Sequence, residues 1–326
     1  MGRSEGVTSD CRERLLEGIM TGGWGAALKK VRHDLDLAGS PERCLWRSVV
    51  ETQAGERLVL EEIAGDCLMR KREMAGVLAH LSGAGLGRIH PYRRSREGGF
   101  VHETAGRFWL ARPYIEGGAL KRPDYAFEAW RGVALAGFLK DFHTRGRSIP
   151  HSSQGAPFSI KDFIYSLMQR LADHRPDLQT RLHPVLCHLE EAFMAAHDLL
   201  PTVFCHGDYH PLNVIWSEKA IVSVIDWEFC GYKPELYDLA LLIGCLGMEI
   251  PDALVGPLTL SLLAEFTPCC SEIGMRHLIG LVMAIRFAWL SEWLRAGDEE
   301  MVILECVYLE LLLRERGALK EAWLGQ

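Results

Sequence analysis

Three oxygen-bearing side chains, those of Asp208, Asn213 and Asp226, are spaced so that they could do chemistry together. Asp208 lies in a loop containing Gly and Pro between two apolar runs, and Asn213 closes that loop five residues later. Asp226 follows thirteen residues further on, at the end of the next predicted strand. A hairpin between Asn213 and Asp226 would bring these two side chains near each other. Carboxylate and amide oxygens suit a hard cation such as Mg²⁺, which keeps some water ligands for substrate phosphates.

The residues around these side chains form a compound motif. His206-Gly-Asp-Tyr-His-Pro-Leu-Asn213 has the H-x-D-x-x-x-x-N order of protein-kinase catalytic loops, and Asp226-Trp-Glu228 stands where those enzymes place a metal-binding Asp. At this point the chain resembles the aminoglycoside phosphotransferase and choline kinase family, the small-molecule branch of the kinase-like fold. Three further segments agree with that family's pattern: Phe108–Gly117, Phe138–His143 and Gly231–Ala240. The resemblance spans roughly residues 44–295.

The resemblance implies both a fold and an activity. The fold is α+β, a protein-kinase-like two-lobe fold with a small β-rich N-lobe and a larger helical C-lobe. The activity is that of a small-molecule kinase, which moves the γ-phosphoryl group of ATP or GTP to a hydroxyl of an aminoglycoside-, choline- or amino-alcohol-like acceptor. In this family pattern Asp208 accepts the proton of the hydroxyl, while Asn213 and Asp226 hold Mg²⁺ between the phosphates. Catalysis then rests mainly on positioning and electrostatic stabilisation.

The same resemblance assigns supporting roles around this centre. Main-chain groups of the segment 111–114 are expected to bind the nucleotide base, which makes Ala111, Arg112 and Tyr114 nucleotide-binding residues. Glu73 fits the family's helix glutamate on the nucleotide side. We expect His206 and Asp238 to be structural, bonding loop backbone, and His210 and Glu228 to support the site.

The acceptor site in such enzymes is built mainly from the helical lobe. Trp227, Trp289 and Trp293 are the candidates to line it. Together with acidic residues near position 298, these aromatic side chains suit a cationic amine through cation–π contact. The alternative is that Trp289 and Trp293, which lie at helical spacing, are core residues.

The chain departs from the family pattern in the predicted strand 57–63. Family members place a Lys there, which pairs with a helix Glu and touches the α/β-phosphates, but this position holds Glu61. Glu61 and Glu73 would place two carboxylates where a cation is expected, and like charges at about 4 Å cost on the order of 1 kcal/mol even in water.

Three explanations stay open for this departure. The strand register is shifted, or a nearby cation (Arg47, Arg70 or Lys71) reaches the phosphates instead, or the protein is a catalytically weak or inactive kinase-like binding protein. A hydrolase that uses Asp208 to activate water is a further possibility, but no residue in the sequence completes a nucleophile arrangement for it.

A zinc site is a competing interpretation of the motif. Cys205, His206, Asp208 and His210 cluster in the sequence, but their spacing does not match the usual structural zinc patterns. We expect Cys205 to be the buried last residue of a strand.

The pattern of apolar residues predicts the elements that position these groups. A hairpin (44–52 and 57–63), a helix (67–81) and two strands (101–103 and 108–115) form a small α+β unit. Helices are predicted over 11–20, 24–37, 127–144, 160–171 and 182–199, short strands over 202–205, 213–216 and 221–225, and helices from 235 to the end. We therefore predict an N-terminal helical extension (1–39), an N-lobe (40–115) and a C-lobe (116–326).

Composition narrows the classes of function. The chain has 326 residues with 48% apolar and 24% charged residues, an ordinary globular composition. A net charge of −7 argues against a nucleic-acid partner. Apolar runs are too short for a membrane span, and the ten cysteines lie mostly in apolar surroundings without a C-x-x-C pair. These features predict a cytoplasmic protein with reduced thiols whose partner is a small molecule, and they leave its oligomeric state open.

Overall fold

The computed structural model describes residues 9–39, 44–150 and 158–325. Contacts divide the chain into two compact units. The sheet unit comprises Met1–Gly118, Leu212–Ser217 and Val222–Glu228, and the helical unit comprises the remaining segments. The boundary predicted after residue 115 lies close to the division at Gly118. The boundary predicted between residues 39 and 40 borders residues 40–43, which lie outside the described ranges.

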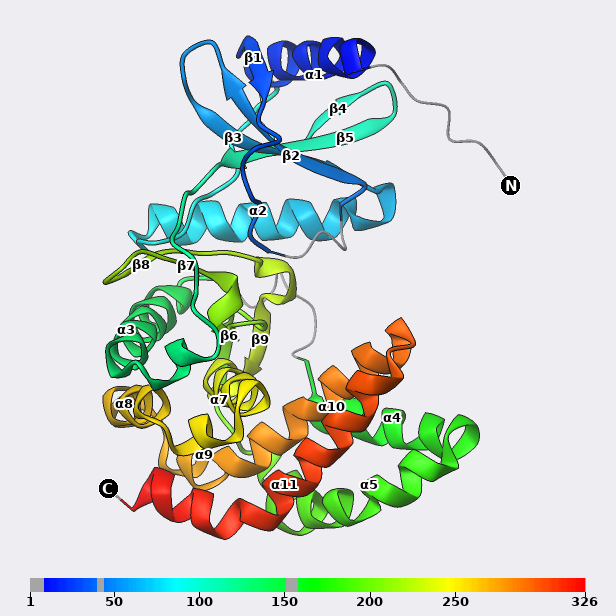
Figure 1. Cartoon of the computed structure of the whole chain (residues 1–326), viewed down its shortest axis with the longest axis vertical. Helices are drawn as coiled ribbons and strands as arrows, with labels where there is room; N and C mark the ends of the chain where they lie inside the picture. The colour runs from blue at the N-terminus through cyan, green and yellow to red at the C-terminus, as the bar shows by residue number, and fades with distance from the viewer. Residues whose placement is uncertain (1–8, 40–43, 151–157, 326) are drawn as a thin grey trace. The chain divides into compact units, whose positions relative to one another are not determined.

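The sheet unit is built on five antiparallel strands in the order β1-β2-β3-β5-β4 (Figure 1). The predicted hairpin is confirmed as β2 and β3, joined by a turn in which Gly55 has φ +82°. The predicted strands near 101–115 are confirmed as β4 and β5. The bounds are β1 (Leu28–Val31), β2 (Trp46–Thr52), β3 (Arg57–Ile63), β4 (His102–Thr104) and β5 (Arg107–Pro113).

The prediction of a helix over 24–37 is wrong. Helix α1 (Ser9–Trp24) ends before Gly25, whose φ of +65° favours glycine, and the chain then forms β1. Leu28 pairs with Thr52 and Val31 with Val50, so β1 is an edge strand of the sheet. The apolar spacing of this segment is compatible with a helix, but pairing with β2 decides its conformation.

The two faces of the sheet carry different chemistry. Side chains of Val50, Leu58 and Leu60 alternate onto the face that packs against α1, where they form one apolar cluster with Ile19 and Met20. The opposite face faces α2 (Leu68–Gly83), so the sheet lies between the two helices (Figure 1). Because side chains alternate along a strand, this second face carries Val59, Glu61 and Arg112.

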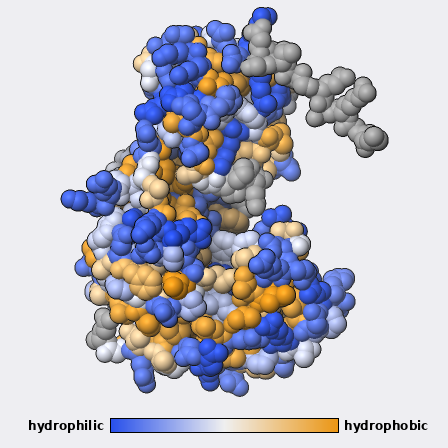
Figure 2. Space-filling view, in the orientation of Figure 1, coloured by the Kyte–Doolittle hydropathy of each residue, from blue (hydrophilic) through white to orange (hydrophobic). Residues whose placement is uncertain are grey.

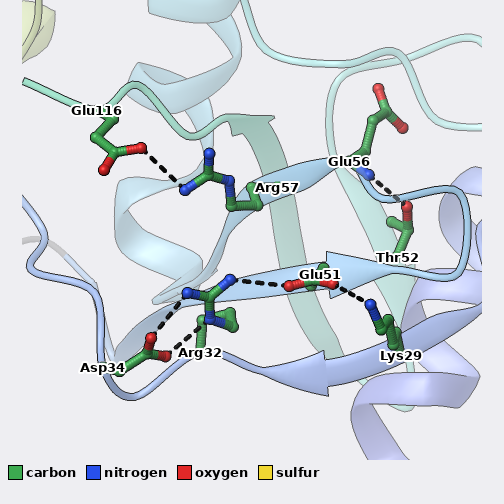
Figure 3. A network of polar contacts seen from close by, with 8 residues as sticks. All are labelled: Lys29, Arg32, Asp34, Glu51, Thr52, Glu56, Arg57 and Glu116. Atoms are coloured by element: carbon green, nitrogen blue, oxygen red, sulfur yellow. Dashed lines mark hydrogen bonds and ion pairs between the residues drawn. The ribbon is translucent and has the colours of Figure 1, made fainter.

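Charged side chains line the outer strands of the sheet unit. Arg32 contacts both Asp34 and Glu51, and Lys29 contacts Glu51 from β1 (Figure 3). Figure 2 shows the resulting mostly hydrophilic surface over this unit. Arg32 and Lys29 together balance the charge of Glu51, whose side chain is 12% exposed.

The helical unit confirms the prediction of a mainly helical second part. Its long helix α10 packs against α4, α7 and α11. The helix predicted over 182–199 begins earlier, at Pro176, because proline is tolerated in the first turn of a helix. The bounds are α3 (Ala129–Gly146), α4 (Ile160–His174), α5 (Pro176–Leu189), a π-helix (Glu190–Met194), α6 (Ala195–His197), α7 (Tyr237–Glu249), α8 (Pro257–Phe266), α9 (Glu272–Arg276), α10 (Leu278–Ala296) and α11 (Glu299–Leu324).

Two small antiparallel sheets lie in the central segment of the chain. The strands β7 (Val214–Trp216) and β8 (Ile221–Val224) confirm the predicted hairpin between Asn213 and Asp226. Strand β6 (Thr202–Cys205) pairs with β9 (Gly231–Pro234), a strand that we did not predict because it has four residues and ends in proline. No helix in the described part of the chain is both long and apolar enough to cross a lipid bilayer.

Candidate active site

The loop that carries Asp208 is held by a buried carboxylate of the helical unit. Asp238, in the first turn of α7, accepts hydrogen bonds from the main-chain N–H groups of His206 (2.7 Å) and Gly207 (2.8 Å). The N–H of Asp208 in turn donates to Nδ1 of His206 at 3.2 Å. These three bonds hold the backbone that leads into Asp208, which is the structural role expected for His206 and Asp238.

Gly207 lies at a position that other residues cannot occupy. Its φ is +83°, and a Cβ added there would collide with the main-chain carbonyl of Phe229. An L-amino acid would therefore meet both backbone strain and a steric clash. The glycine lets the chain turn tightly just before Asp208.

Asp208 is accessible and has a basic neighbour. Its side chain is 19% exposed, and its Oδ1 lies 3.5 Å from Nε2 of His210. The imidazole of His210 meets the ring of Trp289 edge-on, with ring centroids 6.1 Å apart. A partly exposed carboxylate on a rigid loop is suited to accept a proton from a bound hydroxyl.

The other two oxygen-bearing side chains, those of Asn213 and Asp226, belong to the sheet unit. Asn213 precedes β7 and is buried. Its main-chain carbonyl accepts a hydrogen bond from the N–H of Ile225 at 2.9 Å, which places the backbone of Asp226 beside it. Asp226 has φ +66°, a strained conformation for a non-glycine residue that often marks functional positions. The amide and carboxylate oxygens form a hard donor set that fits Mg²⁺.

A turn of backbone covers one side of Asp226. A Cβ built on Gly39 would lie 3.1 Å from Oδ2 of Asp226, so only a glycine lets the chain pass this close. The guanidinium of Arg47 donates to the carbonyl of Gly39 and so ties this segment to β2. We did not predict this role for either residue, because nothing in the local sequence links position 39 to Asp226.

Glu61 on β3 is the centre of a buried cluster of charges. Its carboxylate accepts hydrogen bonds from Nε of Arg112 (3.0 Å) and from the hydroxyl of Tyr92 (3.1 Å), and it lies 3.7 Å from Nζ of Lys71. Burial alone would raise the pKa of the Glu61 carboxyl, but the charges of Arg112 and Lys71 hold that pKa below its ordinary value. Lys71 also donates a short hydrogen bond to the carboxylate of Glu228.

This cluster corrects the predicted partner of Glu61. Glu73 lies on the exposed face of α2 and pairs with Arg70 at 3.8 Å, so it does not stand beside Glu61. The helix residue that faces Glu61 is Lys71, two positions earlier. The two like charges that the sequence suggested are therefore an ion pair of opposite charges.

The segment 111–114 uses part of its backbone for the fold of the sheet unit. The carbonyl of Ala111 accepts from the N–H of Arg93 at 2.7 Å, and the N–H of Tyr114 donates to the carbonyl of Arg57 at 3.0 Å. Arg112, whose side chain is 16% exposed, turns its guanidinium toward Glu61. That main-chain groups of this segment bind the nucleotide base stays a prediction.

Trp227 is a packing residue. Its side chain is buried, and its Nε1 donates to the carbonyl of Val224 at 3.0 Å, within the same short segment. It therefore does not offer the open aromatic surface predicted for an acceptor site. Its burial could not be read from the sequence, because both neighbours, Asp226 and Glu228, are polar.

Trp289 and Trp293 are partly exposed and stack on one another with centroids 5.6 Å apart. Beneath them, Arg286 and Glu305 form a buried ion pair, and Nε1 of Trp293 donates to Glu305 at 3.3 Å. One side of this aromatic pair rests on the buried ion pair and the other side meets solvent, so the two residues are not wholly core. Their role in an acceptor site stays a prediction.

Cys205 is buried at the end of β6, as predicted. Its thiol lies with ligand atoms of His143 and Asp238 in a group whose atoms are all within 4.8 Å of one another. Asp238 already accepts two main-chain hydrogen bonds, and burial raises the pKa of the Cys205 thiol well above its ordinary value. Asp238 links this group to the backbone of the Asp208 loop.

Known proteins share this architecture. The structure resembles an aminoglycoside 2′-phosphotransferase-IIIa in its GDP complex (18% identity, 93% of this chain and 98% of that chain, TM-score 0.66). It also resembles an amicoumacin kinase in complex with AMP-PNP and Ca²⁺ (14%, 92% and 93%, 0.64) and a macrolide 2′-phosphotransferase from Brachybacterium faecium (15%, 91% and 97%, 0.58). No curated protein sequence matches the chain significantly.

These likenesses confirm the two-lobe, kinase-like α+β fold. The model of the phosphotransferase enzyme family matches residues 48–267, which contain both the Glu61 cluster and the Asp208–Asp226 segment. The match covers more than half of the chain. The chain thus belongs to the phosphotransferase enzyme family.

Proposed function

We propose that this protein is a small-molecule kinase, which transfers the γ-phosphoryl group of ATP or GTP to a hydroxyl of its acceptor. The observation that carries the proposal is the rigid Asp208 loop, with Asp238 bonded to the backbone of His206 and Gly207. A protein that only binds ligands has no need of a carboxylate held so firmly. The nucleotide complexes of the similar structures support a nucleotide donor.

Each side chain has a role in the proposed reaction. Asp208 accepts the proton of the acceptor hydroxyl and orients its oxygen toward the phosphorus atom. Asn213 and Asp226 would hold Mg²⁺, which neutralises charge on the transferring phosphoryl group when bound. His210, beside Asp208, helps to keep the carboxylate in place.

The stacked pair Trp289 and Trp293 indicates the kind of acceptor. Arg286 lies 5.5 Å from the ring of Trp289, so the nearest buried charge is positive and discourages a second cation on this ring. The carboxylates of this region are paired, Glu305 with Arg286 and Glu292 with Arg295. An acceptor with a planar or apolar face therefore fits better than a polyamine.

The test is release of nucleoside diphosphate from ATP and from GTP with millimolar Mg²⁺, over a panel of macrolides, aminoglycosides and amino alcohols. We expect turnover with at least one neutral or weakly cationic acceptor. Asp208→Asn should abolish turnover and leave nucleotide binding within about twofold, because the side chain acts on the acceptor hydroxyl. Nucleotide binding without turnover on any acceptor would favour the alternative, a kinase-like binding protein.

A further inference from the structure

Lys71 is a buried cation on α2. Its side chain is 4% exposed, and its ammonium lies between the carboxylates of Glu228 and Glu61. Glu228 is two residues after Asp226, the proposed metal ligand. The ammonium therefore contacts a residue two positions from Asp226, the group that would hold the nucleotide phosphates through Mg²⁺.

The ammonium retains hydrogen-bonding capacity. A protonated lysine has three N–H donors, and Lys71 makes one hydrogen bond within the described ranges, to Glu228. Glu61 is 3.7 Å away, an ion pair but beyond hydrogen-bond distance. Its neighbouring carboxylates raise the pKa of Lys71, so the side chain is charged at neutral pH. A buried charged donor with spare N–H groups is suited to an anionic ligand.

The other cations of this region are engaged differently. Arg47 donates to the carbonyl of Gly39. Arg70 donates to the main-chain carbonyl of Glu228 and is about one-third exposed. Arg112 lies on β5, and its Nε donates to the carboxylate of Glu61 at 3.0 Å. Lys71, by contrast, is buried and donates to the carboxylate of Glu228.

We propose that Lys71 binds the phosphates of the nucleotide, and that Glu61 and Glu228 are the positioning residues that hold its ammonium for this purpose. The inference rests on the proposed function and adds to it which residue supplies the phosphate-binding cation. That residue is on α2, and its partner Glu61 is on β3. Glu61 is compatible with phosphate binding because Arg112 and Lys71 balance its charge.

The test compares two ligands that differ only in phosphate. Binding of ADP and of adenosine is measured by calorimetry, in EDTA and in Mg²⁺. We expect Lys71→Met to weaken ADP binding at least tenfold in both buffers and to leave adenosine binding within twofold. Arg72→Met, which removes the same charge from the exposed face of the same helix, should change neither affinity by more than twofold.

The outcomes separate this inference from the proposed function. Equal losses for ADP and adenosine, or no loss for either, would show that Lys71 has no phosphate role. If the wild-type protein binds neither ADP nor GDP, the proposed function itself fails; if it binds only GDP, the same comparison is made with GDP and guanosine. Should Lys71→Met not fold, Lys71→Met/Glu228→Gln removes the lysine together with its nearest carboxylate, and the same difference between ADP and adenosine decides the question.

Discussion

Glu61 on β3 and Lys71 on α2 form a buried ion pair at 3.7 Å, in which the strand supplies the acid and the helix supplies the base. The family pattern quoted for the sequence has the opposite arrangement. The pair therefore still joins one acid and one base across the strand and the helix. The departure at position 61 does not by itself argue for loss of activity.

The Glu61–Lys71 pair should show strong coupling in stability. Replacing Glu61 with Leu leaves the charges of Lys71 and Arg112 with fewer partners, and we expect it to lower the unfolding free energy by about 3 kcal/mol. We expect a loss of the same size for Lys71→Met. The double variant should cost at least about 1 kcal/mol less than the sum of the two single variants. Urea denaturation followed by circular dichroism measures all four proteins. Strict additivity would show that the pair is not energetically coupled.

Gly207→Ala should disable the Asp208 loop. The residue has φ +83° and a Cβ there would strike the carbonyl of Phe229, so the loop must move. A shift of about 1 Å in a catalytic group can reduce kcat by about 100-fold, which is the loss we expect. Gly297→Ala is the matched control, because its φ is +70° and no atom lies within 4 Å of its Cβ position. That variant should lose about 1 kcal/mol of stability and keep its kcat.

Much of this architecture follows from the sequence. The apolar alternation of β2 and β3 and the compound motif around Asp208 predict the hairpin, the two-part organisation and the loop with its Asp238 support. Such features depend on local patterns, which is why they can be recognised without a structure.

The remaining features depend on which side of an element faces its neighbour. Lys71 and Glu73 are two residues apart on α2, and the sequence does not show which of them turns toward β3. Strand β1 likewise exists because β2 offers it an edge, although its own residues fit a helix. Trp227 has polar neighbours and is nevertheless buried. In each case tertiary packing overrides the local pattern.

His143 should make the protein sensitive to acid. Its Nε2 is buried without a hydrogen-bond partner within the described ranges, and burial lowers the pKa of the imidazole to about 4. Because the unfolded chain binds this proton from about pH 6.5 downward, stability is lost as pH falls toward 4. We expect the unfolding free energy of His143→Gln to rise by about 2 kcal/mol relative to that of the wild type when the pH is lowered from 7 to 4.5. Thermal or urea unfolding at the two pH values checks this, and parallel changes in both proteins would contradict it.

Asp238 should have the opposite dependence. Burial raises the pKa of its carboxyl to about 6, so the folded protein holds a proton that the unfolded chain releases above about pH 4. The contribution to stability is therefore present in acid and is lost as pH rises through 6. The unfolding free energy of Asp238→Asn should fall by about 2 kcal/mol relative to that of the wild type when the pH is lowered from 7 to 4.5. If the unfolding free energy of Asp238→Asn instead changed with pH in the same direction as that of His143→Gln, the two groups would not titrate independently.

Trp289→Ala should affect the acceptor and spare the nucleotide. The ring stacks on Trp293 and meets His210 edge-on, next to Asp208, so an acceptor whose hydroxyl reaches Asp208 has this surface beside it. Loss of one stacking surface is worth about 1 kcal/mol, which corresponds to a rise of roughly five- to tenfold in the KM of the acceptor. Initial rates at saturating nucleotide measure this, with the KM of the nucleotide expected within twofold of the wild type. Trp289→Phe should restore most of the affinity because a planar face remains.

Trp130→Ala serves as the control. Trp130 lies on α3, is partly exposed and donates to Glu128, and its replacement should change neither KM. A rise of the nucleotide KM alone would place Trp289 on the donor side and overturn its assignment to the acceptor.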